Sequence, residues 1–128
     1  MESVRAGEAN GKVSQRKTLL VVDDEPDIRE SLRDALEDEG YRVAVARNGK
    51  EALEVLRTLE KPFAVILDII MPVMSGAEFY AALQADALFA DTPVLISTSD
   101  ASRAPSGVLI MKKPIDLERF LDAVANLF

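Results

Sequence analysis

The chain has 128 residues, 48% of them hydrophobic and 29% charged, which is typical of one globular domain with its own core. It contains neither cysteine nor histidine, which excludes disulfides, thiolate or imidazole metal ligands and histidine-based acid–base catalysis. Carboxylates, hydroxyls and lysines are therefore the groups left to form a chemical site.

The charge is concentrated in the part of the chain that is expected to fold. Four of the 15 basic residues and two of the 22 acidic residues precede Thr18, so residues 18–128 carry a net charge of −9. Such an acidic surface disfavours nucleic acid as a direct partner. Residues 1–17 lack the apolar segment of a signal peptide and predict a disordered leader before a domain over residues 18–128. No apolar run approaches a membrane span. The absence of cysteine is compatible with the cytosol, and we expect a cytoplasmic protein.

The first segment of this domain predicts a buried strand followed by a helix. The apolar run of residues 18–22 ends on three acids, Asp23, Asp24 and Glu25. Pro26 stands at what would be the first helical position, and Gly40 closes the element. Between them, apolar residues recur on one helix face, namely Ile28, Leu32, Ala35 and Leu36.

A second strand and a second helix are expected next. Residues 41–45 alternate between larger apolar and smaller or charged side chains, which suits a strand nearer a sheet edge. Asn48 and Gly49 predict a turn. The inner face of the following helix would hold Ala52, Leu53, Leu56 and Leu59.

Residues 63–67 form a short, nearly all-apolar run that ends abruptly on Asp68. Such a run favours a central parallel strand that is covered on both faces. Asp68 would then lie at the carboxyl end of the strand, where ligands bind in open α/β sheets. The alternative interpretation is an aspartate that caps a helix or forms a turn.

The second half of the chain continues the alternation. Ser75 and Gly76 open a third helix with Phe79 and Leu83 facing inward, residues 94–97 form a fourth strand that ends at Thr98, and residues 108–111 form a fifth. Asp116 is the expected N-cap of a last helix with the stripe Leu117, Phe120, Leu121, Val124 and Leu127. This pattern predicts an α/β fold with a doubly wound, five-stranded parallel sheet in the order 2-1-3-4-5.

In this topology the acidic pair Asp23 and Asp24, Asp68 and Thr98 meet at one sheet edge, and Lys113 arrives beside them. Three crowded carboxylates require a cation, and an all-oxygen ligand set suits Mg²⁺ or Mn²⁺. A hydroxyl and an ammonium group beside a metal favour phosphoryl oxygens, and one carboxylate can act as the nucleophile.

Four motifs, VVDDEPDIRESL, LDIIMPVMSG, PVLISTS and KKPID, occur in an order and at a spacing that resemble the receiver domain of two-component response regulators. The resemblance covers about Lys17 to Phe128 and implies a flavodoxin-like fold. It implies a domain that takes a phosphoryl group from a histidine kinase or phosphotransfer protein and signals to a downstream protein through an altered binding surface. Such a domain catalyses its own phosphorylation and slow dephosphorylation and is not a turnover enzyme.

The resemblance also implies roles for the acidic residues. Asp68 would be the phosphoacceptor and a ligand of Mg²⁺, Asp24 would bind the metal directly, and Asp23 would bind it mainly through water. Ile70 would contribute only its backbone carbonyl. An acidic pair after a strand can also be ordinary surface charge.

Two further roles follow from the resemblance. Thr98 would donate a hydrogen bond to the phosphoryl group, and Lys113 would pair with a phosphoryl oxygen and, before phosphorylation, with Asp68. The Lys113–Pro114 bond resembles the cis peptide of the family. A surface lysine whose alkyl chain lies along the protein is the alternative interpretation of Lys113.

The sequence departs from the family pattern in two places. Ile110 occupies the position of the usual aromatic switch residue, so a rotating ring cannot couple to Thr98. Only residues 99–107 separate the fourth and fifth strands, too few for the usual fourth helix, although nine extended residues reach about 30 Å. The apolar side chains that this helix would cover are expected either to be capped by residues 99–107 or to form a partner or self-association surface.

Two other functions remain in view. A degenerate receiver, acting as a binding or scaffold module without phosphorylation, is favoured by Ile110 and by the missing helix. The acidic pair, Asp68, Thr98 and Lys113 argue against it. An independent phosphatase is less well supported, because hydrolases with an aspartate nucleophile typically carry a second aspartate two residues on, where this chain has Ile70.

Overall fold

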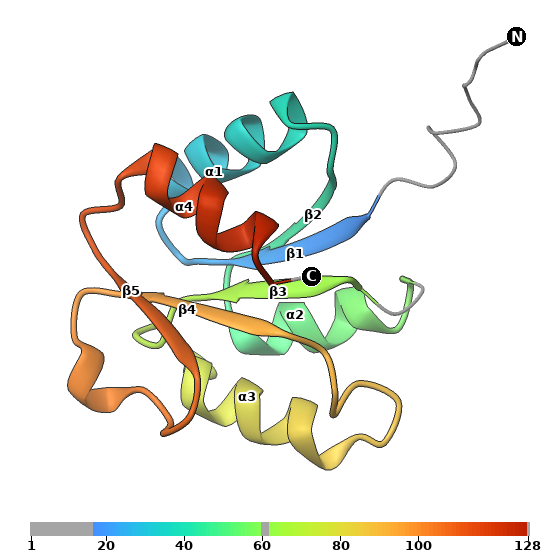
Figure 1. Ribbon diagram of the computed structural model, residues 1–128. Helices are drawn as coiled ribbons and strands as arrows, with labels where there is room; N and C mark the ends of the chain where they lie inside the picture. Colours follow the sequence, from blue (N-terminus) through green and yellow to red (C-terminus); the bar gives the residue numbers. More distant parts are fainter. Residues whose placement is uncertain (1–16, 60–61, 128) are drawn as a thin grey trace, which may run out of the picture.

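The computed structural model describes residues 17–59 and 62–127, and these contain one parallel sheet in the order β2-β1-β3-β4-β5 (Figure 1). The strands are β1 (Thr18–Val22), β2 (Arg42–Ala46), β3 (Ala64–Leu67), β4 (Val94–Thr98) and β5 (Leu109–Lys112). The predicted fold class and strand order are therefore confirmed. The expected leader lies outside the described residues, except for Lys17.

Helices cover both faces of the sheet (Figure 1). Helices α1 (Pro26–Asp38) and α4 (Leu117–Ala125) cover one face, and α2 (Gly49–Leu56) and α3 (Gly76–Ala85) cover the other. Each face has its own core, because alternate residues of the central strands point to opposite sides. Phe120 is fully buried in the first core and Phe79 in the second. All four residues of β3 are buried, as expected for a central strand.

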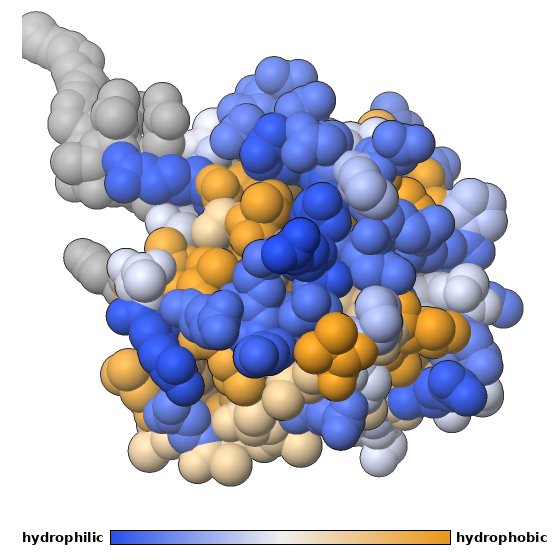
Figure 2. All heavy atoms as spheres, turned by 180° about the vertical axis from the view of Figure 1, so that it is seen from behind, coloured by the Kyte–Doolittle hydropathy of each residue, from blue (hydrophilic) through white to orange (hydrophobic). Residues whose placement is uncertain are grey.

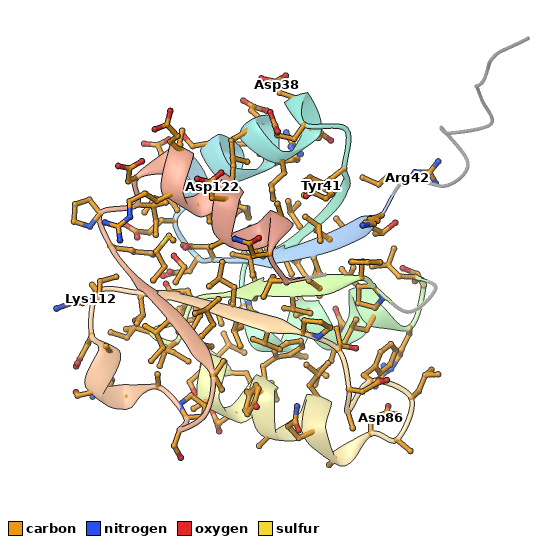
Figure 3. All side chains as sticks on the ribbon, viewed as in Figure 1. Asp38, Tyr41, Arg42, Asp86, Lys112 and Asp122 are labelled. Carbon is orange, nitrogen blue, oxygen red and sulfur yellow. The ribbon has the colours of Figure 1, made fainter. Side chains whose placement is uncertain are left out.

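Polar side chains start three of the helices, two of them at the predicted helix starts (Ser75 and Asp116) and one where a turn was expected (Asn48). Ser75 and Glu78 form a reciprocal capping box at the start of α3, and Asn48 accepts a hydrogen bond from the Glu51 amide at the start of α2. The Asp116 carboxylate accepts hydrogen bonds from two amides of α4. Charged residues on the outer faces, such as Asp38, Asp86 and Asp122, are exposed (Figure 3).

The end of α1 explains why β2 starts one residue later than predicted. Gly40 has a φ of 94°, its amide donates to the Glu37 carbonyl at 3.0 Å, and the Tyr41 amide donates to the Leu36 carbonyl at 3.2 Å. This is a Schellman motif, which requires a residue that tolerates positive φ. Because the Tyr41 amide donates its hydrogen bond to the end of α1, the pairing of β2 with β1 begins at Arg42.

Three other expected details were wrong. Leu59 lies beyond the end of α2 at Leu56, and Leu117, the first residue of α4, is 43% exposed instead of facing the core. Strand β5 begins at Leu109, because Gly107 has a φ of 80° and belongs to the preceding turn. Val108 packs instead against the core between the sheet and α3.

No α-helix lies in the described segment between β4 and β5, as the short connection in the sequence predicted. A single 3₁₀ turn (Ala101–Arg103) stands in its place, so α4 of this chain corresponds to the fifth helix of the usual pattern. Ala104 and Val108 pack against the core on this side, where Phe79, Leu83 and Ile96 are fully or almost fully buried. Residues 99–107 therefore cap the face that the missing helix would have covered.

The outer surface is mainly hydrophilic on the side opposite to that of Figure 1, with hydrophobic residues in separate patches between the charged ones (Figure 2). Within the described part of the chain, no helix has the length and apolar character needed to cross a membrane.

The loop between β3 and α3 contains a strained residue. Val73 has a φ of 70°, a positive value that β-branched residues rarely adopt, and its side chain is 77% exposed. The Met74 amide donates to the Pro72 carbonyl at 2.8 Å, so Val73 is the central residue of a γ-turn of the rare, strained kind. The cost of this conformation is therefore not offset by burial of the side chain.

We expect Val73→Asn to raise the free energy of unfolding by about 1 kcal/mol, because asparagine tolerates a positive φ better than a β-branched residue does and little packing is lost. Val73→Ala, which also lacks the β-branch but gains no local hydrogen bonding, should give a smaller increase. Urea unfolding of the three proteins measures the difference. An asparagine variant less stable than wild type would contradict the assignment of strain.

Candidate functional site

The acidic residues lie where β1 and β3 end. The Asp23 amide donates to the Ala46 carbonyl at 3.1 Å, and the Asp68 amide donates to the Val22 carbonyl at 2.9 Å, so the sheet fixes both backbones. One carboxylate oxygen from each of Asp23, Asp24 and Asp68 lies within 4.8 Å of the others. Asp23 is 1% exposed and Asp68 is 4% exposed, whereas Asp24 is half-buried. The predicted gathering of these three carboxylates is present.

The Lys113 ammonium group reaches into this cluster from the end of β5. Its Nζ atom lies 2.9 Å from Asp23 Oδ2, 3.2 Å from Asp68 Oδ2 and 3.1 Å from Glu25 Oε1. The Lys113 side chain is only 10% exposed, which excludes the alternative of a solvated surface lysine. The Lys113 amide donates to the Thr98 carbonyl at 2.9 Å, and the Lys113–Pro114 bond is cis, as the resemblance implied.

Burial and charge shift the proton equilibria of the site in definable directions. Desolvation raises the pKa of Asp68 above its ordinary value, and the Asp23 charge adds to the increase, although Lys113 and the Ile70 amide oppose it. Burial alone would lower the pKa of Lys113. The hydrogen bond and charge of Asp23, with smaller contributions from Glu25 and Asp68, raise that pKa instead, so Lys113 stays protonated.

Thr98 is the last residue of β4 and is completely buried. Because Leu67 is in register with Ile96, Thr98 lies at the same sheet edge as Asp68. Its Oγ1 accepts a hydrogen bond from the Asp100 amide at 3.3 Å. The Asp100 carboxylate in turn accepts hydrogen bonds from the Ser102 amide and hydroxyl. The hydroxyl of Thr98 is thus joined to the turn that replaces the missing helix.

Ile70 contributes to the site through its backbone. Its amide donates to Asp68 Oδ1 at 3.2 Å, while its side chain is 40% exposed. Gly76 lies against the same segment, and a Cβ atom at this position would meet the Asp68 carbonyl oxygen at 2.0 Å and Ile69 Cα at 2.7 Å. Glycine is therefore required where the start of α3 approaches the chain at Asp68.

Two residues of the site were not anticipated from the sequence. Glu25 shares the Lys113 ammonium group, and the Arg29 guanidinium group donates to the Asp23 carbonyl oxygen at 2.7 Å. The Glu25 amide also donates to Asp23 Oδ1 at 2.9 Å. The unbroken run of three acids after β1 was a signal for Glu25. The i and i+4 spacing of Glu25 and Arg29 gave no comparable signal, because it also suits a solvated helix.

The donor set fits a divalent cation. Three carboxylates offer only oxygen atoms, which suits Mg²⁺ or Mn²⁺, and the Lys113 ammonium group balances only part of their charge. Each carboxylate has several acceptor positions, so contact with Lys113 leaves lone pairs for a metal.

The comparisons with known proteins agree with this geometry. The sequence pattern of the response regulator receiver domain family matches residues 19–125. Response regulator MprA of Mycolicibacterium vanbaalenii is 41% identical over 81 residues, which cover 63% of this chain and 34% of that protein. Response regulator Rre1 of a Synechocystis strain is 43% identical over 83 residues, 64% of this chain and 36% of that protein. The chain thus spans about a third of the length of these curated relatives.

Solved structures of response regulators are also similar to this chain. The chemotaxis response regulator CheY4 of Vibrio cholerae has a TM-score of 0.80 and 30% identity, with 88% of this chain and 99% of that chain covered. Response regulator TrrA of Thermotoga maritima, solved in complex with Mg²⁺-BeF, has a TM-score of 0.77 and 32% identity, with the same coverage of both chains.

We expect Gly76→Ala to destabilise the protein by about 2 kcal/mol or more, because its Cβ would collide with backbone atoms that cannot move independently of Asp68. Gly49→Ala is the matched control. Gly49 also begins a helix, but its Cβ would meet only the flexible Met74 side chain, so a change within about 1 kcal/mol is expected. Equal losses in urea unfolding would contradict the proposed role of Gly76.

The raised pKa of Asp68 predicts a pH-dependent stability. A carboxyl whose pKa is higher in the folded state stabilises that state at pH values below its ordinary pKa of 3.8, and this contribution is lost as the pH rises through the folded-state value. In EDTA at pH 7, we therefore expect Asp68→Asn to be more stable than wild type. The advantage should shrink as the pH falls towards 4.

Urea unfolding of both proteins across this pH range measures the effect. Asp122→Asn, at an exposed position of α4, should show no such trend. An Asp68→Asn protein that is less stable at pH 7 would show that pairing with Lys113 outweighs burial.

Proposed function

The chain belongs to the response regulator receiver domain family, and on this basis we propose that Asp68 accepts a phosphoryl group from a histidine kinase or phosphotransfer protein. The observation that carries the proposal is the contact between Lys113 Nζ and Asp68 Oδ2 at 3.2 Å, at the edge where β1, β3 and β4 end. This contact places a permanent positive charge beside a nearly buried carboxylate. A phosphoryl group attached there would find its charge already partly balanced.

The reaction needs no proton donor from the chain. An oxygen of Asp68 attacks the phosphorus of the donor, the bond from phosphorus to the donor atom breaks with its electron pair leaving on the donor, and an aspartyl phosphate results. Lys113 holds one phosphoryl oxygen by charge, and the Thr98 hydroxyl donates a hydrogen bond to another. The domain thus acts on itself and is not a turnover enzyme.

Asp23, Asp24, Asp68 and the backbone carbonyl of Ile70 are the groups that would hold Mg²⁺ or Mn²⁺. When bound, such an ion neutralises charge on the carboxylates and on the phosphoryl oxygens. Glu25 completes the set of acids around Lys113, with its Oε1 atom 3.1 Å from Nζ. Family membership and the convergence of these residues in space support the proposed roles.

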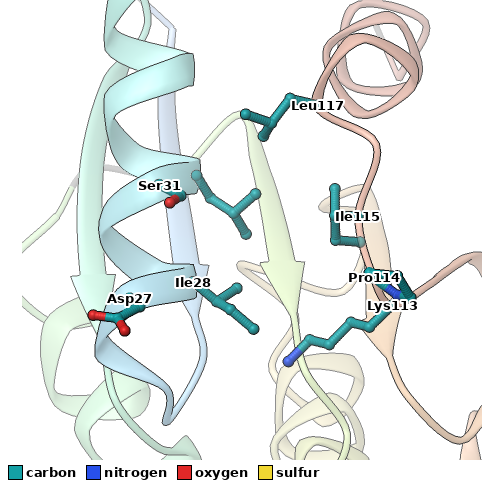
Figure 4. Close-up of a pocket in the computed structure, with 8 residues that line it drawn as sticks. Asp27, Ile28, Ser31, Lys113, Pro114, Ile115 and Leu117 are labelled. Carbon is teal, nitrogen blue, oxygen red and sulfur yellow. The ribbon is translucent and has the colours of Figure 1, made fainter.

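A hollow of about 290 Å³ beside the site supports a protein as the donor (Figure 4). It lies between α1 and the segment after β5, and apolar side chains such as Ile28 and Ile115 line it together with Lys113. Leu117 at its edge is 43% exposed. An apolar surface that borders the phosphoacceptor fits docking of a protein surface that carries the phosphohistidine. A cytoplasmic location follows from the same proposal, because the kinases of such systems phosphorylate their regulators there.

The output would begin at Thr98. Movement of its hydroxyl towards the phosphoryl group would disturb the hydrogen bond from the Asp100 amide, and with it the turn at residues 101–103. Because Ile110 replaces the aromatic switch residue, the change would reach a downstream protein through residues 99–107 and β5. Self-association through this side remains a second output.

A degenerate receiver that works without phosphorylation is the competing proposal. The specific observations that favour it are Ile110, which is 37% exposed, and the turn that replaces a helix. The degenerate-receiver proposal does not explain why two nearly buried carboxylates, Asp23 and Asp68, lie beside Lys113 and Asp24. A direct phosphorylation test separates the two proposals.

Incubation with acetyl phosphate and Mg²⁺ should add the mass of one phosphoryl group to the intact protein, as measured by mass spectrometry. Asp68→Asn should abolish this addition, EDTA should suppress it, and Asp122→Asn should leave it unchanged. Thr98→Ala should still accept the group but should lose the accompanying NMR shifts in residues 99–107. A wild-type protein that shows no Mg²⁺-dependent addition would favour the degenerate receiver.

A further inference from the structure

Strand β5 lies at the edge of the sheet and pairs only with β4. The Lys113 amide donates to the Thr98 carbonyl, so the backbone groups of Met111 and Lys113 face β4. Backbone groups of alternate residues in a parallel strand point to opposite sides. The N–H and C=O groups of Ile110 and Lys112 therefore point away from the sheet, where they offer two donors and two acceptors to another strand.

The side chains around this edge are unusually apolar for an exposed position. Leu109 is 51% exposed and Ile110 is 37% exposed, and both are among the few large hydrophobic residues with this degree of exposure in the described ranges 17–59 and 62–127. Met111 lies on the same side of the sheet as α1 and α4, whereas Ile110 lies on the side of α3. A strand placed along β5 would thus cover apolar side chains on both faces.

A hollow of about 260 Å³ runs along the outside of this edge. It is lined by side chains from both faces of β5 and from the start of α4, namely Ile110, Met111, Lys112, Pro114, Asp116 and Arg119. Because residues that point to opposite faces line one hollow, the hollow must lie over the edge itself. Lys112 is exposed at the left edge of the view in Figure 3.

The charges of this hollow favour an acidic partner. Lys112 and Arg119 are both exposed, whereas the Asp116 carboxylate is occupied with the amides of Glu118 and Arg119 at the start of α4. Two cations therefore face one carboxylate, so the hollow is positively charged overall on a domain whose residues 18–128 carry a net charge of −9. Acidic side chains on an incoming segment would be attracted here and repelled by most other surfaces of the domain.

The geometry points to β5 as the docking site for an extended acidic segment of another protein, which adds a sixth strand to the sheet. Backbone hydrogen bonds to Ile110 and Lys112 would supply affinity, and acidic side chains beside Lys112 and Arg119 would supply specificity. A second copy of this chain fits less well. Antiparallel pairing of two β5 strands would bring two copies of Lys112 and Arg119 together between two acidic domains.

The test uses the unphosphorylated chain and a short synthetic peptide of alternating valine and glutamate, titrated by NMR. Saturable binding should slow hydrogen exchange at the Ile110 and Lys112 amides. The same peptide with lysine in place of glutamate should bind at least about tenfold more weakly. Because no phosphoryl group is involved, a failure here would not affect the assignment of Asp68, and a failure to phosphorylate Asp68 would not affect this surface.

Variants distinguish the contribution of the side-chain charges to peptide binding from that of the backbone hydrogen bonds. The double variant Lys112→Glu and Arg119→Glu should weaken binding of the glutamate peptide about tenfold or more, whereas Arg42→Glu, an exposed cation on the opposite edge strand, should change it less than about twofold. Ile110→Pro removes an outward N–H and should abolish binding. Ile110→Ala keeps that N–H and should retain part of it.

Several results would overturn the proposal. They are the absence of saturable binding, equal binding of the glutamate and lysine peptides, and protection that appears at β2 instead of β5. Light scattering that shows a dimer dependent on Lys112 or Ile110 would assign the edge to a second copy instead. If Ile110→Pro unfolds the protein, the charge-reversal pair and its Arg42→Glu control still decide the outcome.

Discussion

The contact of one ammonium group with three carboxylates is the constraint on which the site depends. Asp23 and Asp68 are nearly buried and adjacent, so the Asp23 charge raises the cost of ionising Asp68, and the positive charge of Lys113 offsets part of that cost. Removing the ammonium group would cost about 3–5 kcal/mol, because buried carboxylate charge would remain without compensation, whereas loss of Asp68 alone leaves Lys113 paired with Asp23 and Glu25. Lys113 comes from β5, whereas the acids come from β1 and β3. The site therefore forms only when strands from both halves of the chain are in place.

The sheet topology makes this convergence possible. In a doubly wound parallel sheet, every strand delivers its last residue to the same edge, so side chains far apart in sequence need no long loops to meet. The backbone bonds from Asp23 to Ala46 and from Asp68 to Val22 continue the sheet into the site itself. Gly76 then lets α3 begin directly against Asp68. The acids are thus held by regular structure, and only their side chains remain to be positioned by Lys113.

Most of the fold could be predicted because its signals are local. Apolar runs marked the buried strands, and Ser75, Asp116 and Pro26 marked helix starts through hydrogen bonds or backbone geometry that involve neighbouring residues. The errors arose where contacts between residues far apart in the sequence decide the burial or the partner of a side chain. Leu117 has the spacing of a core residue, but the core on that side is closed by Phe120 and Val124. Glu25 follows the acidic pair directly, but its contact with Lys113 spans 88 residues of sequence, so the run of acids alone did not assign it a partner.

The short connection between β4 and β5 links the site to the edge of the sheet. It leaves the site at Thr98, whose hydroxyl oxygen accepts a hydrogen bond from the Asp100 amide. It returns to the core through Ala104 and Val108. Val108 leads directly into Leu109 and Ile110, the exposed part of β5. A full helix here would place a longer, rigid element between Thr98 and that strand. Its replacement by one 3₁₀ turn leaves few residues between Thr98 and β5 to absorb a displacement.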